Sequence, residues 1–254
     1  MLHPKFTAPK FADVMLDLEP KLQDILFYGD PHSNWKPLLN SVNEMRPKSV
    51  FIFGDLIDKT QGPKALEDTR QVLLELLNKQ IDVRIVLGNH DADTDAIFNL
   101  VFEEFGSLIC HGTVLELEQQ GLRVACLGGV FRGKIWDPNI QTHPPFYSQA
   151  EWLSKNVKTA HFKGGVARKH RTSIFPETYE TLRHTQADIL ITHEAPSTHP
   201  FGFKVLDDLA MDLGAKLIIH GHHHKVSKDI ACGGKIAVRG LGLAEAWRPN
   251  RLSI

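Results

Sequence analysis

Short apolar runs alternate along this chain with longer segments that have one apolar face. The runs Asp24–Tyr28, Val50–Phe53 and Val83–Leu87 have the length and residue types of buried strands. Apolar residues at helical spacing follow each run. They predict helices from Trp35 to Val42 and over about 63–78 and 94–105. Buried strands that alternate with amphipathic helices are typical of parallel βαβ units.

The second half of the chain begins with a different pattern. Val114–Glu118 and Leu122–Leu127 flank Gln119-Gln120-Gly121 and predict a hairpin that either continues the first sheet or starts a second. The alternation then resumes, with a helix, a strand, a helix and a strand expected at about 176–184, 188–191, 204–213 and 217–219, and two more strands between 226 and 243. We therefore expect an α/β fold in which two mixed sheets pack face to face as a sandwich, with helices outside and ligands on loops along one edge.

Residues 129–173 interrupt this alternation. They combine clustered Gly and Pro with several aromatic and basic side chains, and they show one helical pattern near Gln149–Val157. We expect a long excursion that covers the site, within a single domain of residues 1–254. A solvated basic loop is the alternative for any one of its cationic residues.

Composition narrows the classes of function. With 254 residues and a formal charge of -1, the chain resembles an ordinary globular protein, and its neutrality disfavours a nucleic-acid partner. Its first 20 residues lack an apolar signal region, and no run reaches the ~20 apolar residues of a membrane span, so a cytoplasmic enzyme is expected. Cys110, Cys126 and Cys232 lie far apart, which favours buried thiols over a disulfide framework or a zinc ribbon.

Five polar clusters occur where an apolar run stops. Their side chains are carboxylates, imidazoles and an amide, which bind hard or borderline divalent metals. Separate turns and helix caps would explain one such cluster, but they are a poor explanation for five at successive strand ends. The clusters are Gly29-Asp30-Pro31-His32, Gly54-Asp55-Leu56-Ile57-Asp58, Gly88-Asn89-His90-Asp91, Thr192-His193 and Gly221-His222-His223-His224.

The donors in these clusters suffice for two metal ions that share one carboxylate. Asp55 can serve both ions, because a single Asp at a strand end can bridge two metals. Mixed nitrogen and oxygen donors without thiolate indicate Mn²⁺ or Fe, with Zn²⁺ as the alternative. The first ion would take Asp30, His32, Asp55 and His224, and the second would take Asp55, Asn89, His193 and His222.

These clusters resemble the pattern of the calcineurin-like metallophosphoesterase family. That pattern is D-x-H, G-D-x-x-D, G-N-H-D/E, a single H and G-H-x-H, and this chain matches it in order from about residue 24 to 243. The resemblance implies a two-sheet sandwich flanked by helices and a bimetal phosphoesterase with the ligand division given above. It also implies that His90 is the general acid and that Asp58 orients its ring, although Asp58 could instead be a turn residue.

Departures from the family pattern bear on the substrate. Relatives that act on phosphoproteins usually have arginines after the second Asp and before G-N-H, where this chain has Lys59 and Leu87. The leading hypothesis is therefore hydrolysis of a small, nucleotide-like phosphomonoester or phosphodiester, contacted by Asn89, Arg132 and Trp136. The alternatives are a Ser/Thr protein phosphatase and a catalytically idle metal-binding scaffold of the same fold. The sequence does not decide the oligomeric state.

Overall fold

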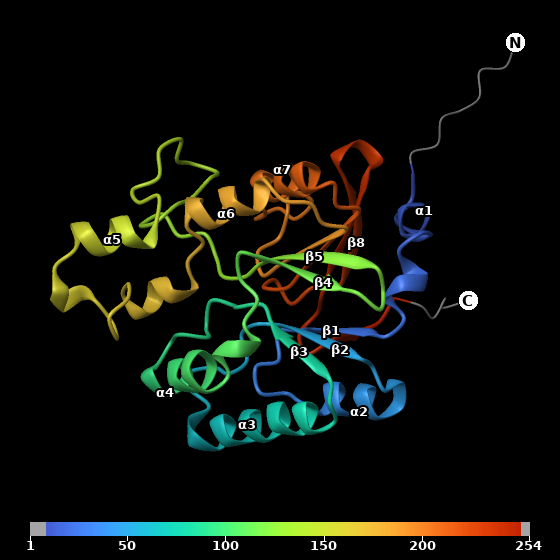
Figure 1. Cartoon of the computed structure of the whole chain (residues 1–254), viewed down its shortest axis with the longest axis horizontal. Coiled ribbons are helices and arrows are strands. Elements are labelled where there is room, and N and C mark those ends of the chain that lie inside the picture. The colour runs from blue at the N-terminus through green and yellow to red at the C-terminus, as the bar shows by residue number, and fades with distance from the viewer. Residues whose placement is uncertain (1–8, 250–254) are drawn as a thin grey trace, which may run out of the picture.

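Two β-sheets form the centre of the protein, and the computed structural model describes residues 9–249 (Figure 1). The first sheet has the strand order β10-β1-β2-β3. β1, β2 and β3 run parallel, and β10 pairs antiparallel with β1 at one edge. The strands are β1 (Ile25–Gly29), β2 (Ser49–Phe53), β3 (Asp82–Ile85) and β10 (Ala246–Trp247).

The second sheet has six strands in the order β4-β5-β6-β7-β9-β8. Its four inner strands are parallel, and an antiparallel strand closes each edge. The predicted hairpin therefore starts a second sheet, and both sheets are mixed. The strands are β4 (Thr113–Leu117), β5 (Leu122–Leu127), β6 (Ile189–Thr192), β7 (Leu217–His220), β8 (Ser227–Ala231) and β9 (Ile236–Gly240).

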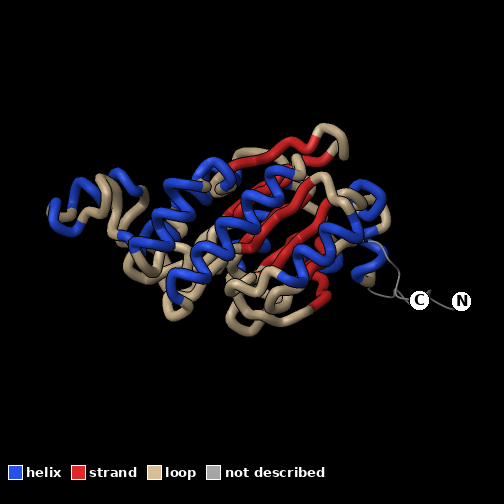
Figure 2. The backbone as a smooth tube through the Cα atoms, turned by 90° about the horizontal axis from the view of Figure 1, so that it is seen from below, coloured by secondary structure: helices blue, strands red, loops and turns tan. Residues whose placement is uncertain are grey.

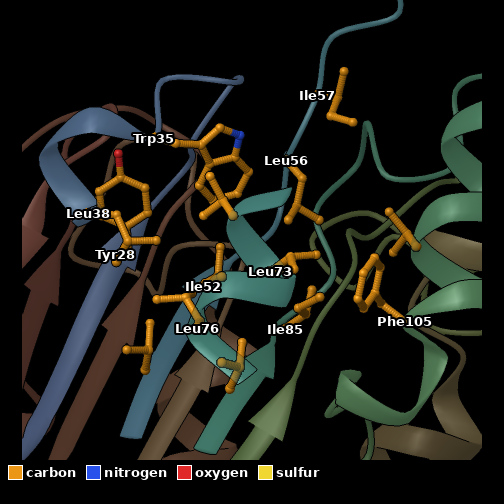
Figure 3. Close-up of a cluster of buried hydrophobic side chains, with 14 of the residues drawn as sticks. Tyr28, Trp35, Leu38, Ile52, Leu56, Ile57, Leu73, Leu76, Ile85 and Phe105 are labelled. Atoms are coloured by element: carbon orange, nitrogen blue, oxygen red, sulfur yellow. The ribbon is translucent and has the colours of Figure 1, made fainter. Parts of the chain in front are cut away.

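Alternate side chains of the strands fill two different layers. Phe27 and Phe51 belong to the buried cluster between the sheets, where their rings stack with centroids 5.6 Å apart. The residues that follow them on each strand, Tyr28 and Ile52, belong to the cluster beneath the helices on the outer face, which Figure 3 shows. This period of two is what a strand buried on both faces requires, and it explains the uninterrupted apolar runs in the sequence.

Helices cover the outer faces of both sheets. Figure 2, seen from below, shows helices crossing over the strands of the first sheet. Side chains of α2 and α3 pack on the first sheet, and side chains of α6 and α7 pack on the second. The α-helices are α1 (Phe11–Met15), α2 (Lys36–Met45), α3 (Gly62–Asn78), α4 (Asp95–Phe98), α5 (Gln149–Lys155), α6 (Pro176–Arg183) and α7 (Lys204–Leu213). Short 3₁₀ turns span Glu19–Leu22, Gly106–Leu108, Lys158–Ala160, Arg168–Thr172 and Cys232–Gly234.

The structure confirms the two-sheet α/β class and differs from the expected elements in detail. The helix expected over about 94–105 divides into α4 and a π-helical segment, Asn99–Glu104. At the end of this segment, Phe105 N–H donates to the Leu100 carbonyl oxygen, 3.1 Å away. The sequence pattern also missed α1 and β10, which are too short to show periodicity. No helix among residues 9–249 combines the length and the hydropathy that a membrane span requires.

The excursion over residues 129–173 is attached to the second sheet at both ends. Phe131, Trp136 and Ile174 belong to the same buried cluster as residues of β5, β6 and α7. Between these ends, the segment that contains α5 extends beyond the sheets (Figure 1). Its one expected helix is confirmed as α5, and its two ends share the core of the second sheet.

Candidate metal centre

All seven predicted metal ligands lie just beyond the carboxyl ends of parallel strands. The first sheet contributes the loops that follow β1, β2 and β3, and the second contributes those that follow β6 and β7. Because parallel strands end at the same edge of a sheet, loops distant in sequence meet there. The seven residues are Asp30, His32, Asp55, Asn89, His193, His222 and His224.

The first group of donors consists of Asp30, His32, Asp55 and His224. One ligand atom from each of the four lies within 4.8 Å of the others. His32 Nε2 is 3.0 Å from His224 Nε2 and 3.9 Å from Asp55 Oδ2, and His224 Nε2 is 3.8 Å from Asp30 Oδ1. Both carboxylates are buried and the His224 imidazole is exposed, so the group opens toward solvent on one side.

The second group consists of Asp55, His193 and His222, with the same 4.8 Å limit between ligand atoms. His193 Nε2 lies 3.4 Å from Asp55 Oδ2 and 3.3 Å from the Asn89 amide oxygen, so Asn89 adds a neutral donor to the group. Asp55 belongs to both groups. The structure therefore brings together the donors expected for two ions, with Asp55 between them.

The surroundings of two imidazoles are compatible with metal binding. His193 Nδ1–H donates to the Phe53 carbonyl oxygen, 3.0 Å away, and Nε2 faces Asp55 Oδ2 and the Asn89 amide oxygen. His222 Nδ1 is buried and has no hydrogen-bond partner among residues 9–249. An outer partner that fixes the orientation of a ligating histidine is a common feature of metal sites. These residues therefore fit divalent ions.

The buried charges of the site also favour a cation. Burial raises the pKa of Asp30 to about 7, and the neighbouring Asp55 and Asp91 carboxylates add to the rise. Burial alone would lower the pKa of His193, but Asp55 and Asp30 raise it to about 10. Burial would also raise the pKa of Asp55, but His193 outweighs it and the pKa stays below its usual range. A proton on His193 thus balances charge that a divalent ion could balance instead.

The backbone at the ligands adopts an uncommon conformation. Side chains other than glycine avoid the left-handed region because Cβ approaches the following carbonyl oxygen, and each such residue costs about 1–3 kcal/mol. Strain of this kind persists where the surrounding structure fixes it. Five ligands lie in this region: Asp30 (φ 33°), His32 (φ 41°), Asp55 (φ 49°), His222 (φ 69°) and His224 (φ 53°).

Two glycines of the clusters allow the loops to approach one another. A Cβ on Gly54, whose φ is 61°, would overlap the backbone nitrogen of Gly88. A Cβ on Gly221 would lie 2.5 Å from Asp30 Oδ2. Larger residues at these positions would therefore push the ligand loops apart.

Asp91 is a buried residue that holds two of these loops together. Its carboxylate accepts hydrogen bonds from the backbone N–H groups of Asp55 (3.2 Å), Leu56 (3.0 Å) and Gly88 (2.7 Å). Burial raises its pKa to about 6, against the lowering effect of these hydrogen bonds. Its place beside Asn89 and His90 in the third cluster gave no indication of this bridging contact.

The structure corrects the predicted contact between Asp58 and His90. Asp58 Oδ1 lies 2.8 Å from Nδ1 of His32. His90 Nδ1 is instead 2.7 Å from Oδ2 of Asp93, a residue that the sequence analysis did not single out. The Asp93 N–H also donates to the His90 carbonyl oxygen at 3.0 Å, so both residues belong to one tight turn. An Asp three residues after the histidine was the available signal.

Asp93 also affects the charge of His90. Burial lowers the pKa of His90, but the hydrogen bond to Asp93 and the charge of Asp55 outweigh this effect and raise the pKa. The Arg168 guanidinium, from the excursion, donates to the Asp93 carbonyl oxygen at 2.9 Å and pairs with Asp95. The excursion thus supports the turn that carries the predicted acid.

The two predicted substrate contacts in the excursion have different surroundings. Arg132 Nη1 donates to the Thr172 carbonyl oxygen at 2.7 Å, and Nη2 lies 3.5 Å from the Asn89 carbonyl oxygen, beside the ligands. Trp136 is only 9% exposed and makes edge contacts with the rings of Phe131 and Tyr179. The expectation that Trp136 stacks on a substrate is corrected, because its ring is part of the core.

The excursion carries most of the positive charge near the site. Residues 129–173 hold eight Lys or Arg against two Asp or Glu, a formal charge of +6, while the remaining residues hold 21 against 28, a formal charge of -7. Burial and the charges of Arg132, Lys169 and Lys134 lower the pKa of His170 to about 4, which shows that these cations gather around one ring. An anionic ligand at the centre would approach past this region.

Several known proteins are similar to this chain. It is 40% identical over 202 residues to an uncharacterized protein of Haemophilus influenzae, covering 79% of this chain and 83% of that protein. The crystal structure of TT1561 from Thermus thermophilus matches with a TM-score of 0.53 at 14% identity, covering 87% of this chain and 89% of that one. A dimetal phosphatase from Danio rerio matches with a TM-score of 0.50 at 12% identity, covering 87% and 88%. These structures show the fold alone.

A family model identifies the chain more specifically. The model of calcineurin-like phosphoesterases matches residues 24–226. The matched range begins at the first strand of the first sheet and includes every residue of the two donor groups. The chain therefore belongs to the calcineurin-like phosphoesterase family.

Proposed function

We propose that this protein hydrolyses small phosphoesters with two divalent ions, Mn²⁺ or Fe in preference to Zn²⁺. The observation that carries the proposal is the position of Asp55, whose carboxylate lies in both donor groups. The mixed nitrogen and oxygen donor set without thiolate supports the choice of metals. When bound, two such ions supply Lewis-acid stabilisation of the phosphoryl group and activate a water nucleophile.

The ligands divide between deep carboxylates and more exposed imidazoles. Asp30 and Asp55 are at most 2% exposed and form the floor of the site, and His224 is at its open side. His222 N–H donates to both oxygens of Asp30, at 3.0 and 3.1 Å, so the loops that follow β1 and β7 are directly linked. This link fixes the distance between donors from the two sheets.

His90 supplies the proton that the leaving oxygen requires. Its backbone N–H donates to Asp55 Oδ1 at 2.8 Å, which holds the residue beside the centre, and Asp93 holds its ring through Nδ1. Nε2 is then free to donate to a leaving alkoxide. The raised pKa keeps the imidazole protonated to higher pH, as a general acid requires.

Asp58 has a different role from the one implied by the family resemblance. Its contact with His32 Nδ1 orients a predicted metal ligand, so that Nε2 faces the first donor group. We infer that Asp58 acts on metal affinity and that Asp93 acts on proton transfer.

A small nucleotide-like monoester or diester is the proposed substrate class. The cations of the excursion favour an anion, and the absence of arginine at positions 59 and 87 disfavours a Ser/Thr protein phosphatase. Arg132, whose guanidinium lies beside the Asn89 backbone, is the proposed contact for a non-bridging phosphate oxygen.

Metal analysis combined with two substrates tests this proposal. Protein purified without chelator and reloaded with Mn²⁺ is expected to bind close to two equivalents and to hydrolyse p-nitrophenyl phosphate or bis-p-nitrophenyl phosphate. A stoichiometry fixed at one would exclude the bimetal site. Two bound ions without hydrolysis of either ester would favour the metal-binding scaffold.

A further inference from the structure

A group of aromatic side chains lies immediately beside the second donor group. The ring of His222 has its centroid 4.9 Å from that of His193, and the ring of His223 lies another 4.9 Å from His222. His223 is not among the proposed ligands, and its ring continues the row of imidazoles away from the centre.

Two further rings extend this row. His199 stacks on His223 with centroids 3.7 Å apart and planes inclined by 19°. Phe201 lies 5.8 Å from His199 and 6.5 Å from His223, and it is 76% exposed. We call His199, Phe201 and His223 the aromatic platform. An exposed phenylalanine at the end of an ordered stack leaves an aromatic surface available to a ligand.

The loop that carries His199 and Phe201 is firmly held. Its ends are joined where Phe203 N–H donates to the Ala195 carbonyl oxygen at 2.9 Å, and Gly202 N–H donates to the His199 carbonyl oxygen at 2.9 Å. From the excursion, Asn139 Nδ2 donates to the Gly202 carbonyl oxygen at 3.2 Å. Phe201 is therefore exposed although its backbone is fixed, and a preorganised contact surface costs little entropy on binding.

Polar atoms beside the platform have no partner. His223 Nε2 and Thr198 Oγ1 are buried and lack a hydrogen bond among the residues that the structure describes. Buried polar atoms are normally satisfied, so an unpaired imidazole nitrogen in the platform is unusual for a ring that only fills the core.

We propose that the aromatic platform binds a nucleobase carried by the ester group of the substrate. The inference rests on the proposed phosphoesterase function, because it places the phosphate at the metal centre and the base beside His222. Stacking on aromatic side chains is tolerant of base identity, so the platform predicts a preference for nucleotides over ring-free phosphates and not for one base.

Equilibrium binding separates this inference from catalysis. We would titrate Mn²⁺-loaded protein with AMP and with ribose 5-phosphate, which has the same phosphate and sugar but no base, and follow the heat of binding. Every protein compared would also carry His90→Ala, so that turnover of these alkyl esters is slow during the titration. Protein with the intact platform is expected to bind AMP roughly 5- to 100-fold more tightly, the range of one stacked base. Phe201→Ala should reduce this preference severalfold, and Phe201→Tyr, which keeps the ring, should retain it.

Val157→Ala is the matched control, since it removes another exposed apolar side chain, 71% exposed, from the excursion. It should leave both affinities unchanged. If wild-type protein hydrolyses p-nitrophenyl esters but the His90→Ala protein binds the two probes equally, the platform is overturned and the phosphoesterase proposal stands. If no ester is hydrolysed but Phe201→Ala still loses the preference for AMP, the platform stands and the proposed reaction fails.

Discussion

The metal centre and the excursion border the same edge of the sandwich but are built in opposite ways. The centre places buried carboxylates and strained ligands directly on strand ends, with each loop bonded to another. The excursion is basic and largely irregular, with its ends in the core of the second sheet and side chains such as Arg168 bonded to the first half of the chain. A site fixed by two sheets can keep atomic distances constant, whereas a loop can change its surface without disturbing them. We infer that the first performs the chemistry and the second selects the ligand.

The largest effect is expected at the residue shared by both donor groups. Asp55→Asn removes a charge from both groups, so we expect loss of metal binding together with loss of turnover. Metal content and kcat measure the two effects. The control is Asp82→Asn, which makes the same change at the first residue of β3, at the end of the sheet away from the donor groups. The Asp82 carboxylate is 39% exposed and pairs with Arg84. Retention of both ions and of near-normal turnover in Asp55→Asn would show that Asp55 is not shared.

His90→Ala should separate catalysis from metal binding. Both ions should remain, because His90 belongs to neither donor group. Loss of a general acid costs about 10²–10⁴-fold in rate. The loss should be greatest for alkyl esters and smallest for p-nitrophenyl esters, whose leaving group needs little protonation. An equal loss for every leaving group would contradict the assignment.

A pair of Asp→Asn changes tests whether Asp93 orients His90 and whether Asp58 orients His32. Asp93→Asn weakens one charge-assisted hydrogen bond to His90, worth about 1.5–3 kcal/mol, so we expect kcat for alkyl esters to fall roughly 10- to 100-fold with metals retained. Asp58→Asn should instead lower metal affinity about 10- to 100-fold, because its partner His32 is a proposed ligand. The opposite pattern, with metal loss in Asp93→Asn alone, would restore Asp58 as the partner of His90.

The smallest effects are expected in the excursion. Lys134 and Lys169 are exposed and lie near His170. They can therefore attract an anionic ligand only by electrostatic interaction that solvent screens. Changing either residue to Ala should raise KM about 2- to 5-fold and leave kcat unchanged, and the effect should shrink as salt is added. A large fall in kcat on a small ester would show that these residues contribute to catalysis. The division of roles between the centre and the excursion would then be wrong.

The sequence predicted which donors lie together better than it predicted their hydrogen-bond partners. Asp30, Asp55 and His193 could be found because each is a strong donor at the end of an apolar run, and the topology of parallel strands then brings them together. The contact between His90 and Asp93 depends on the conformation of one turn, which residue spacing does not specify. Sequence alone favoured Asp58, since it occupies the expected place in a known pattern.

Burial in the excursion was also beyond sequence reasoning. Trp136 lies among glycines, prolines and charged residues, which are typical of a surface loop. It is buried because the chain on either side returns to the second sheet, a tertiary effect without local periodicity. The inner strands β1, β2, β5, β6 and β7, by contrast, were predicted to within two residues, since burial on both faces produces a continuous apolar run.

The left-handed backbone of the ligands links metal supply to the lifetime of the folded protein. Five strained residues and a set of buried carboxylates oppose folding until a cation compensates them. Ions that bind only the folded chain add stability in proportion to the logarithm of their free concentration. The metal-depleted protein should therefore melt at a lower temperature and be degraded faster in a cell, so that scarcity of metal would lower the amount of the protein as well as its activity.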